Sequence, residues 1–293
     1  MRKLVNQEIR EIGVYLNMEK KDSKSLAERC IAYLVKRGFK IALLEGQISY
    51  QHELVHYYPS SIFYEQPDCI LVLGGDGTLL SVARKSCFSC MPIFGINLGK
   101  LGFLTEGEAA HYEETLKNLT TGHYYIEERM MLSCIITRKN SGAHEYTALN
   151  DVLVKSRGSR MMEIRAFANG ATIDKFRADG LIISTATGST GYSLAAGGPV
   201  VSPRAKVMIL NPICPHRLHD RAYVLPEDEV ITLEFGEREK DIVVTLDGQT
   251  TVSITPEDKV QVQKSSHCTR LIRLNEISSY ERLRIKLLSD FES

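Results

Sequence analysis

The sequence has no excess of charge of either sign, because 36 lysines and arginines balance 36 aspartates and glutamates over 293 residues. No overall field therefore draws the chain to nucleic acid or to an anionic membrane. No apolar run approaches the ~20 residues that a membrane-spanning helix needs. The first residues, MRKLVNQEIREIG, lack the apolar core of a signal peptide. The composition is that of a globular protein, which we expect to be cytoplasmic.

The cysteines also give no indication of a disulfide framework. The seven cysteines are odd in number and scattered, and several stand within apolar segments. This pattern predicts buried free thiols in a reducing compartment. Cys87 and Cys90 form a single C-x-x-C without a second pair or a neighbouring histidine, which disfavours a zinc site.

The first part of the chain alternates apolar runs with segments of helical spacing. Strands are predicted at 12–16, 39–44, 69–73 and 92–96, and helices at 25–36, 78–86 and 112–119. Strands separated by helices pair in parallel through helical crossovers. We therefore predict an open, mostly parallel α/β domain over residues 1–128, with ligands beyond the carboxyl ends of its strands.

After residue 128 the pattern becomes β-rich. Short strands are predicted at 131–138, 146–154, 163–168, 171–176, 181–184, 207–210, 230–235, 242–246, 251–254 and 259–263. Asn169-Gly170 is a strong hairpin signal. Helical segments are nearly absent, so residues 129–273 are predicted to form an all-β sandwich. The tail, 274–293, fits strand or helix and is expected to pack back on the first domain.

The most informative segment runs from the predicted strand at 69–73 into Gly74-Gly75-Asp76-Gly77-Thr78. Glycine permits positive φ and a close approach to a ligand, and free amides at a helix start attract phosphate. A carboxylate repels phosphate, so Asp76 is best explained if it acts on a hydroxyl or through a metal ion. The alternative is a structural junction whose aspartate caps the helix.

Two further segments are rich in hydrogen-bonding groups. Asn150-Asp151 interrupts an apolar run and either caps a β-bulge or binds the hydroxyls of a sugar. The stretch 179–199 places hydroxyls and glycines after a strand, followed by Tyr192. Such a surface suits phosphate and ribose, and the tyrosine offers a face for a flat ring. The alternative is a hydroxyl-rich turn.

Three smaller features are weaker signals. Asp247-Gly248-Gln249 alone indicates a hairpin turn. The prolines around His216 suggest a rigid turn in which this histidine is structural. Arg177 either neutralises Asp179 or meets a ligand phosphate.

Taken in order, these segments resemble the NAD kinase family over residues 69–249. The resemblance lies in GGDGT at 74–78, GINLGKLGFL at 95–104, Asn150-Asp151, and DGLIISTATGSTGYSLAAGGPV at 179–200. It implies an α/β domain, a β-sandwich, and transfer of the terminal phosphoryl of ATP to the 2′-hydroxyl of the adenosine ribose of NAD. It also implies a divalent cation, with Mg²⁺ favoured, and a homodimer or homotetramer whose subunits share sites.

The resemblance assigns Asp76 as the general base. The residues that it implies for NAD and ATP binding are Gly75, Gly77, Thr78, Asn150, Asp151, Arg160, Arg177, Asp179, Thr190, Gly191, Tyr192, Ser193, Leu194, Ala195 and Gln249. No metal ligands are assigned.

The sequence departs from the family pattern at three positions. Asp151 stands where glutamate is usual, Gly191 where alanine is usual, and Ala186 where proline is usual. Some members carry a basic residue that faces phosphate on the helix after the loop. The corresponding residue here would be Arg84. The rival hypotheses are a lipid kinase with the same GGDG motif, and a non-catalytic NAD(H)-binding module.

Overall fold

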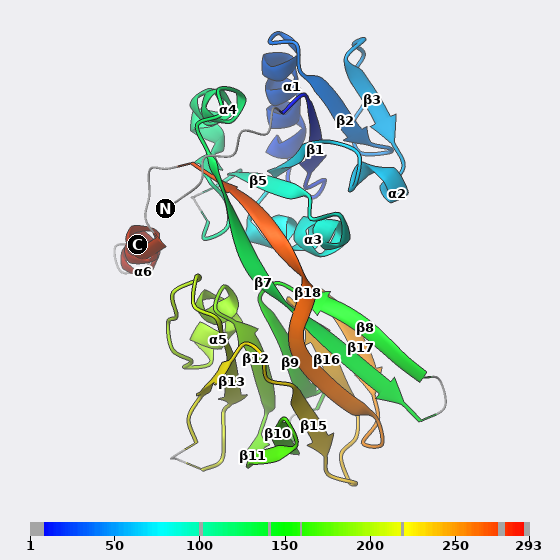
Figure 1. Ribbon diagram of the computed structural model, residues 1–293, viewed down its shortest axis with the longest axis vertical. Coiled ribbons are helices and arrows are strands. Elements are labelled where there is room, and N and C mark those ends of the chain that lie inside the picture. The colour runs from blue at the N-terminus through cyan, green and yellow to red at the C-terminus, as the bar shows by residue number, and fades with distance from the viewer. Residues whose placement is uncertain are drawn as a thin grey trace. The chain divides into compact units, whose positions relative to one another are not determined.

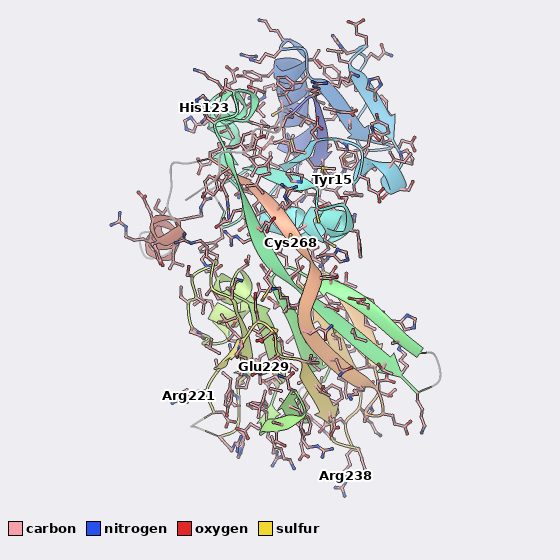
Figure 2. The ribbon with its side chains drawn as sticks, in the orientation of Figure 1. Tyr15, His123, Arg221, Glu229, Arg238 and Cys268 are labelled. Atoms are coloured by element: carbon pink, nitrogen blue, oxygen red, sulfur yellow. The ribbon has the colours of Figure 1, made fainter. Side chains whose placement is uncertain are left out.

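The computed structural model describes residues 9–99, 102–139, 142–158, 160–217, 220–274 and 279–289. The chain divides into two compact units, one of residues 1–128 and 269–293 and the other of residues 129–268. It passes from the first unit to the second within strand β7 (Tyr125–Arg138). It returns within β18 (Lys259–Arg273), just after Cys268, which Figure 2 labels on that strand.

The first unit is built on a parallel sheet with the strand order β5-β4-β1-β2-β3. Figure 1 labels β5, β1, β2 and β3 of this sheet. Its strands are β1 (Glu11–Leu16), β2 (Lys40–Leu44), β3 (Val55–Tyr58), β4 (Cys69–Leu73) and β5 (Pro92–Asn97). The end of β18 and the short β6 (Gly107–Glu108) pair in parallel with β5. The expected open parallel α/β fold is confirmed, and β3 is a strand that the apolar pattern did not indicate.

Helices cover both faces of this sheet. Helix α1 (Asp22–Val35) and α4 (Tyr112–Thr120) bury their apolar sides in one core with alternate residues of β1, β4 and β5. Helix α3 (Asp76–Ser86) lies on the other face, where Gly95 of β5 leaves room for Leu79. The remaining helices are α2 (Ser60–Phe63) and α6 (Ser279–Ser289). The ambiguous tail is thus helical over its described part.

The strand order creates a switch point between β1 and β4. From β1 the chain moves outward to β2 and β3, and it then returns to place β4 on the other side of β1. Connections that leave in opposite directions open a crevice at the carboxyl ends of the two strands. The glycine-rich segment begins at that end of β4, so the fold places it where open α/β sheets bind ligands.

The second unit is a sandwich of two sheets around one core. One sheet has the order β14-β13-β12-β9-β16-β17, and the other contains β11-β10-β15 with β18, β7 and β8. Apolar side chains of both sheets form a single cluster. The further strands are β8 (Gly142–Ala148), β9 (Asp151–Ser156), β10 (Met162–Ala168), β11 (Ala171–Ala178), β12 (Gly180–Thr185), β13 (Val207–Ile213), β14 (Tyr223–Pro226), β15 (Ile231–Phe235), β16 (Ile242–Leu246) and β17 (Thr250–Ile254).

The predicted sandwich is confirmed, but three details of the prediction were wrong. The strand expected at 146–154 is two strands, since the chain leaves the ladder at Leu149 and Asn150 between β8 and β9. Strand β18 continues to Arg273, ten residues beyond the expected end. A short helix, α5 (Tyr192–Ala195), follows the hydroxyl-rich loop.

The seven cysteines are all free thiols. Four of them, Cys30, Cys69, Cys87 and Cys134, are buried as expected, whereas Cys90 and Cys214 are exposed. Burial raises the pKa of Cys30 to about 12, with the nearby Arg29 opposing, so this thiol stays protonated at neutral pH. Among the described residues, no helix is both long and apolar enough to cross a membrane.

Candidate active site

The glycine-rich turn after β4 is tight because side chains occupy the space that Cβ atoms would need. A Cβ on Gly74 would lie 2.4 Å from the Thr78 hydroxyl oxygen. Gly75 precedes the first residue of α3 in an extended conformation, with φ −91°. None of Gly74, Gly75 and Gly77 has positive φ, so the expectation that these glycines serve left-handed backbone was wrong. Instead, these glycines allow close packing and leave the start of the helix without side chains.

The carboxylate of Asp76 is held by the loop after β5. Its Oδ2 accepts the backbone N–H of Phe103 at 2.8 Å, and its Oδ1 accepts those of Leu104 and Thr105 at 3.2 and 3.3 Å. A Cβ on Gly102 would lie 2.0 Å from Oδ1, so this glycine is needed for the loop to approach. Asp76 therefore does not cap α3 with its side chain, as the structural alternative had it.

A lysine in the loop that follows β1 lies close to the same turn. Lys20 Nζ lies 3.9 Å from the position that a Cβ on Gly75 would take. The loop that carries it is fixed by Asn17, whose N–H donates to the Leu73 carbonyl and whose Nδ2 donates to the Thr78 hydroxyl. Arg84 lies in the last turn of α3, roughly 12 Å along the axis from Asp76. Of these two cations, Lys20 and not Arg84 lies near the turn.

In the second unit, Asn150 and Asp151 stand at the start of β9 beside the turn that follows β16. Asp247 in that turn accepts the backbone N–H groups of Leu149, Asn150 and Asp151 at 3.0, 2.7 and 3.1 Å. Asp247 adopts the left-handed conformation, with φ +50°, and is followed by Gly248. The Asp-Gly hairpin is therefore also the anchor that shapes the Asn150-Asp151 segment.

Asp151 is a buried carboxyl, 5% exposed. Burial, and then the negative charge of Asp247, raise the pKa of Asp151 to about 7. At neutral pH this side chain can both accept and donate a hydrogen bond.

The hydroxyl-rich loop after β12 folds over this segment. Thr185 donates its hydroxyl to the Leu149 carbonyl at 2.7 Å, and its N–H donates to the Asn150 carbonyl at 2.9 Å. A Cβ on Gly188 would lie 2.1 Å from the Asn150 carbonyl oxygen. A Cβ on Gly191 would lie 3.4 Å from Asn150 Nδ2 and 3.9 Å from Asp151 Oδ2. The two segments that the sequence singled out are thus one site.

The other residues of this stretch divide by exposure. Tyr192 is 46% exposed, Ala195 is exposed, and Thr190 and Leu194 are partly buried. Ser193 is fully buried, and Asn211 Nδ2 donates to its carbonyl at 3.0 Å, so Ser193 serves the packing of α5. Gln249 is exposed in the turn that contains Asp247.

Three predicted binding residues lie at the opposite end of β12. Asp179 precedes β12 and Arg177 is the second-last residue of β11, whereas Asp151 pairs with Ser184 near the far end of β12. The length of β12 separates the two groups by about 17 Å. Arg160 is close to Asp179 in the fold, because Met162 pairs with Ala178. All three side chains are exposed, and the His216 N–H donates to the Arg177 carbonyl.

Comparison with known proteins decides the family. Residues 12–124 match the ATP-NAD kinase N-terminal domain, and residues 149–274 match the ATP-NAD kinase C-terminal domain. A protein named NAD kinase from Caldanaerobacter subterraneus subsp. tengcongensis is 38% identical over 95% of this chain and 99% of its own length. The chain belongs to the NAD kinase family. An NAD kinase from Heliobacterium modesticaldum is 41% identical over 94% of the chain and 98% of its own length.

Solved structures agree with this family in fold. The NAD kinase from Archaeoglobus fulgidus, crystallised with ATP, has a TM-score of 0.77 and 28% identity, with 95% of this chain and 99% of that chain covered. Yeast NADH kinase, crystallised with NADH, has a TM-score of 0.87 and covers 98% of this chain and 89% of that chain. At 21% identity, the yeast protein supports the fold alone. Membership of the NAD kinase family rules out the lipid kinase hypothesis.

Sequence reasoning missed two residues beside the segments that it singled out, one in each unit. Lys20 belongs to a loop without a recognisable motif, so only its place at the switch point identifies it. Asp247 was treated as an ordinary turn residue. The available signal was an aspartate in a hairpin turn beside a strand whose first backbone N–H groups need an acceptor. Which strand lies beside that turn cannot be read from one sequence.

Proposed function

We propose that this protein transfers the terminal phosphoryl group of ATP to the 2′-hydroxyl of the adenosine ribose of NAD and so forms NADP. The observation that carries the proposal is a carboxylate held at the start of a helix, where the backbone favours anions. Phosphate repels a carboxylate, so this arrangement makes chemical sense when Asp76 receives a proton from an attacking hydroxyl. A module that only binds NAD(H) has no use for such a charge.

Asp76 retains the capacity for that step. An ionised carboxylate has about four lone-pair sites, and the three amide hydrogen bonds use two on Oδ1 and one on Oδ2. The remaining site on Oδ2 would accept the 2′-hydroxyl proton. The ribose oxygen then forms a bond to the γ-phosphorus, the bond from that phosphorus to the β–γ bridging oxygen breaks, and ADP leaves with the bond's electron pair.

The phosphates would meet the amino end of α3 and Lys20. Gly75 and Gly77 leave the helix start without side chains, and the positive end of the helix dipole favours an anion there. The Lys20 ammonium adds a positive charge over Gly75. Both contributions grow as charge builds up on the transferring group, which is the requirement for electrostatic catalysis.

The donor set is compatible with Mg²⁺ carried by ATP. Mg²⁺ in kinase sites binds one or two carboxylates together with substrate phosphates and keeps several waters. Within the described ranges, no three His, Cys, Asp or Glu side chains gather as metal ligands. Because three amides and the attacking hydroxyl use the lone-pair sites of Asp76, the ion would be held by the ATP phosphates and by waters. When bound, the ion would neutralise charge on the phosphates.

The adenosine ribose would bind at Asn150 and Asp151. An amide beside a carboxyl can pair with both the donor and the acceptor of a sugar hydroxyl. Asp247 fixes the backbone of both residues through three hydrogen bonds. Asp151 is one methylene shorter than the glutamate of the family pattern, and Gly191 opens space above it. Tyr192, half exposed, offers a ring face for a base.

Arg160, Arg177 and Asp179 would serve the dinucleotide that binds to a second copy of the chain. They stand about 17 Å from the Asn150-Asp151 group along β12. A two-fold dimer brings such a distant patch of one subunit to the site of its partner. This would give two complete sites in a dimer, each built from two chains.

Mixing two inactive variants tests the shared site. Asp151→Ala removes one part of the site and Asp179→Ala removes the other, so each variant alone should lose most of its activity. If the site is shared, half of the randomly mixed dimers contain one intact site, and activity should recover to about a quarter of the wild-type rate. No recovery in mixtures shown by mass spectrometry to exchange subunits would contradict the shared site.

The proposed reaction itself is tested by incubating the purified protein with NAD, ATP and Mg²⁺. An NADP-specific dehydrogenase reports the product. Cleavage of that product by a 3′-nucleotidase distinguishes a 3′-phosphate from the expected 2′-phosphate, which resists it. NADP that accumulates in proportion to enzyme is the expected result. Tight NAD binding without NADP formation would instead favour the non-catalytic module.

A further inference from the structure

The loop that holds Asp76 is held in turn by two buried arginines from the end of the chain. Arg273, the last residue of β18, donates to the carbonyls of Leu104 and Phe103 at 3.2 and 3.4 Å. Arg282 on α6 donates to the carbonyls of Gly102, at 3.3 Å, and Thr105. Both guanidinium groups are almost fully buried, 5% and 8% exposed at the side chain.

The pattern of these contacts is regular, peptide by peptide. The peptide between Gly102 and Phe103 accepts from Arg282 through its carbonyl and donates to Asp76 through its N–H. The next two peptides accept from Arg273 and donate to Asp76. Three consecutive peptide groups therefore stand between one carboxylate and two cations, each aligned with its carbonyl toward an arginine and its N–H toward Asp76.

Such alignment has two consequences for Asp76. Each arginine polarises the peptides that it binds, and a polarised peptide is a stronger donor to the carboxylate. Each arginine also fixes the direction of those N–H groups, which sets the position of both Asp76 oxygens. Because the loop is short and approaches Asp76 where Gly102 leaves no room for a Cβ, a small shift of its backbone moves the carboxylate.

Two carboxylates hold the arginines in place. Glu106 binds both guanidinium groups, and its Oε2 accepts the Leu274 N–H at 3.0 Å. Glu127 binds Arg273 Nε at 2.9 Å. Burial lowers the pKa of Arg282, with Glu106 and Asp76 among the charges that oppose this effect, so the charge of Asp76 acts on Arg282 as well. The charges of the two arginines and the two glutamates balance.

We propose that Arg273 and Arg282 are positioning residues for Asp76, which act through the peptides of residues 102–105, and that the C-terminal helix α6 (Figure 1) is thereby part of the catalytic apparatus. The inference rests on the proposed function for its catalytic consequence. The physical link between Arg282, the loop and Asp76 does not depend on the proposed function. Neither arginine touches a substrate, so the expected effect is on kcat and not on KM.

The first test compares Arg282→Met with Arg284→Met. Arg284 is exposed on the same helix and is the matched control for charge and helix content. We expect Arg282→Met to lower kcat for NADP formation about 100-fold, the size of loss typical when a reacting group is misplaced. The KM values for ATP and NAD should stay within about twofold of wild type, since Arg282 binds Gly102, Thr105 and Glu106, none of which is assigned to ATP or NAD binding. Arg284→Met should match wild type in both.

The second test follows the loop directly, without reference to activity. Amide hydrogen exchange at Phe103, Leu104 and Thr105 should become faster in Arg282→Met and in Asp76→Ala, and should be unchanged in Arg284→Met. Exchange in β1 reports whether the fold of the first unit is intact. An Arg282→Met protein with unchanged exchange at these three amides, or with wild-type kcat, would overturn the proposal.

Conservative variants keep the proposal testable if Arg282→Met fails to fold. Lysine keeps the charge but cannot reach two carbonyls and Glu106 at once. Arg282→Lys and Arg273→Lys should therefore fold, show intermediate exchange at residues 103–105, and lower kcat about 10-fold. Lysine variants with wild-type exchange and kcat would contradict positioning by the guanidinium groups. If wild type itself makes no NADP, the proposed function fails, while the exchange measurements still decide the link to Asp76.

Discussion

The ionisation of Asp151 should weaken the fold of the second unit as the pH rises. Burial, followed by the charge of Asp247, raises the pKa of Asp151 from 3.8 to about 7. A carboxyl with a higher pKa in the folded state contributes its stability fully below the unfolded pKa, and that contribution is lost as pH rises through the folded pKa. The sensitive range is therefore between pH 3.8 and about 7.

The size of the effect follows from linkage. Each pKa unit corresponds to about 1.4 kcal/mol of differential interaction. Between pH 5 and pH 8, the pKa values of 3.8 and about 7 predict a loss of roughly 3 kcal/mol from Asp151 alone. Asp151→Asn keeps the shape of the side chain and cannot ionise, so the variant should lack this loss.

Urea unfolding followed by far-UV circular dichroism measures the difference, which suits a chain without tryptophan. The free energy of unfolding is determined at pH 5 and pH 8 for wild type, for Asp151→Asn and for Asp228→Asn, whose carboxyl is exposed. Subtraction of each variant's pH dependence from that of wild type cancels the other titrating groups. Equal pH dependence in wild type and Asp151→Asn would refute the assigned burial and charge of this site.

Two further substitutions probe the glycine-rich turn. Lys20→Ala should raise the KM for ATP about tenfold, because it removes one charge-assisted contact to phosphate. It should also lower kcat, because that contact strengthens as charge builds up on the transferring group, while the KM for NAD stays nearly unchanged. Lys24→Ala, an exposed lysine on α1, is the control in steady-state assays. Gly102→Ala should abolish turnover, because its Cβ would stand 2.0 Å from Asp76 Oδ1, whereas Gly99→Ala meets nothing within 4 Å and should behave as wild type. Equal effects of the two lysine variants or of the two alanine variants would contradict these roles.

Local patterns in the sequence predicted the framework of the molecule. The strand at 69–73, the turn GGDG and the helix after it form one continuous signal, and the structure has them as β4, the turn and α3. The alternation of strands and helices gave the parallel sheet, and the hairpin signal Asn169-Gly170 gave the β10–β11 pair. These features depend on neighbours in the chain, which a single sequence contains.

Residues that act across long separations in the chain were not predicted. Asp247 binds amides that lie 96 to 98 positions away, and Arg282 binds carbonyls 177 and 180 positions away. Each has an ordinary local context, a hairpin turn in one case and a charged helix in the other. The ladder that brings β16 beside β9, and the pairing of β18 with β5, create these contacts. Only the assembled fold reveals them.

The most direct test of the central claim compares wild type with Asp76→Asn for both NADP formation and NAD binding. The amide cannot take the proton, and its NH₂ group would face at least one of the N–H donors at Oδ1 and Oδ2. We predict NADP formation by wild type from NAD, ATP and Mg²⁺, and a rate lower by roughly 100- to 10,000-fold in the variant. Calorimetry should give the same NAD affinity for both proteins within about twofold. A variant that forms NADP at the wild-type rate, or a folded wild type that binds NAD and forms none, would contradict the account.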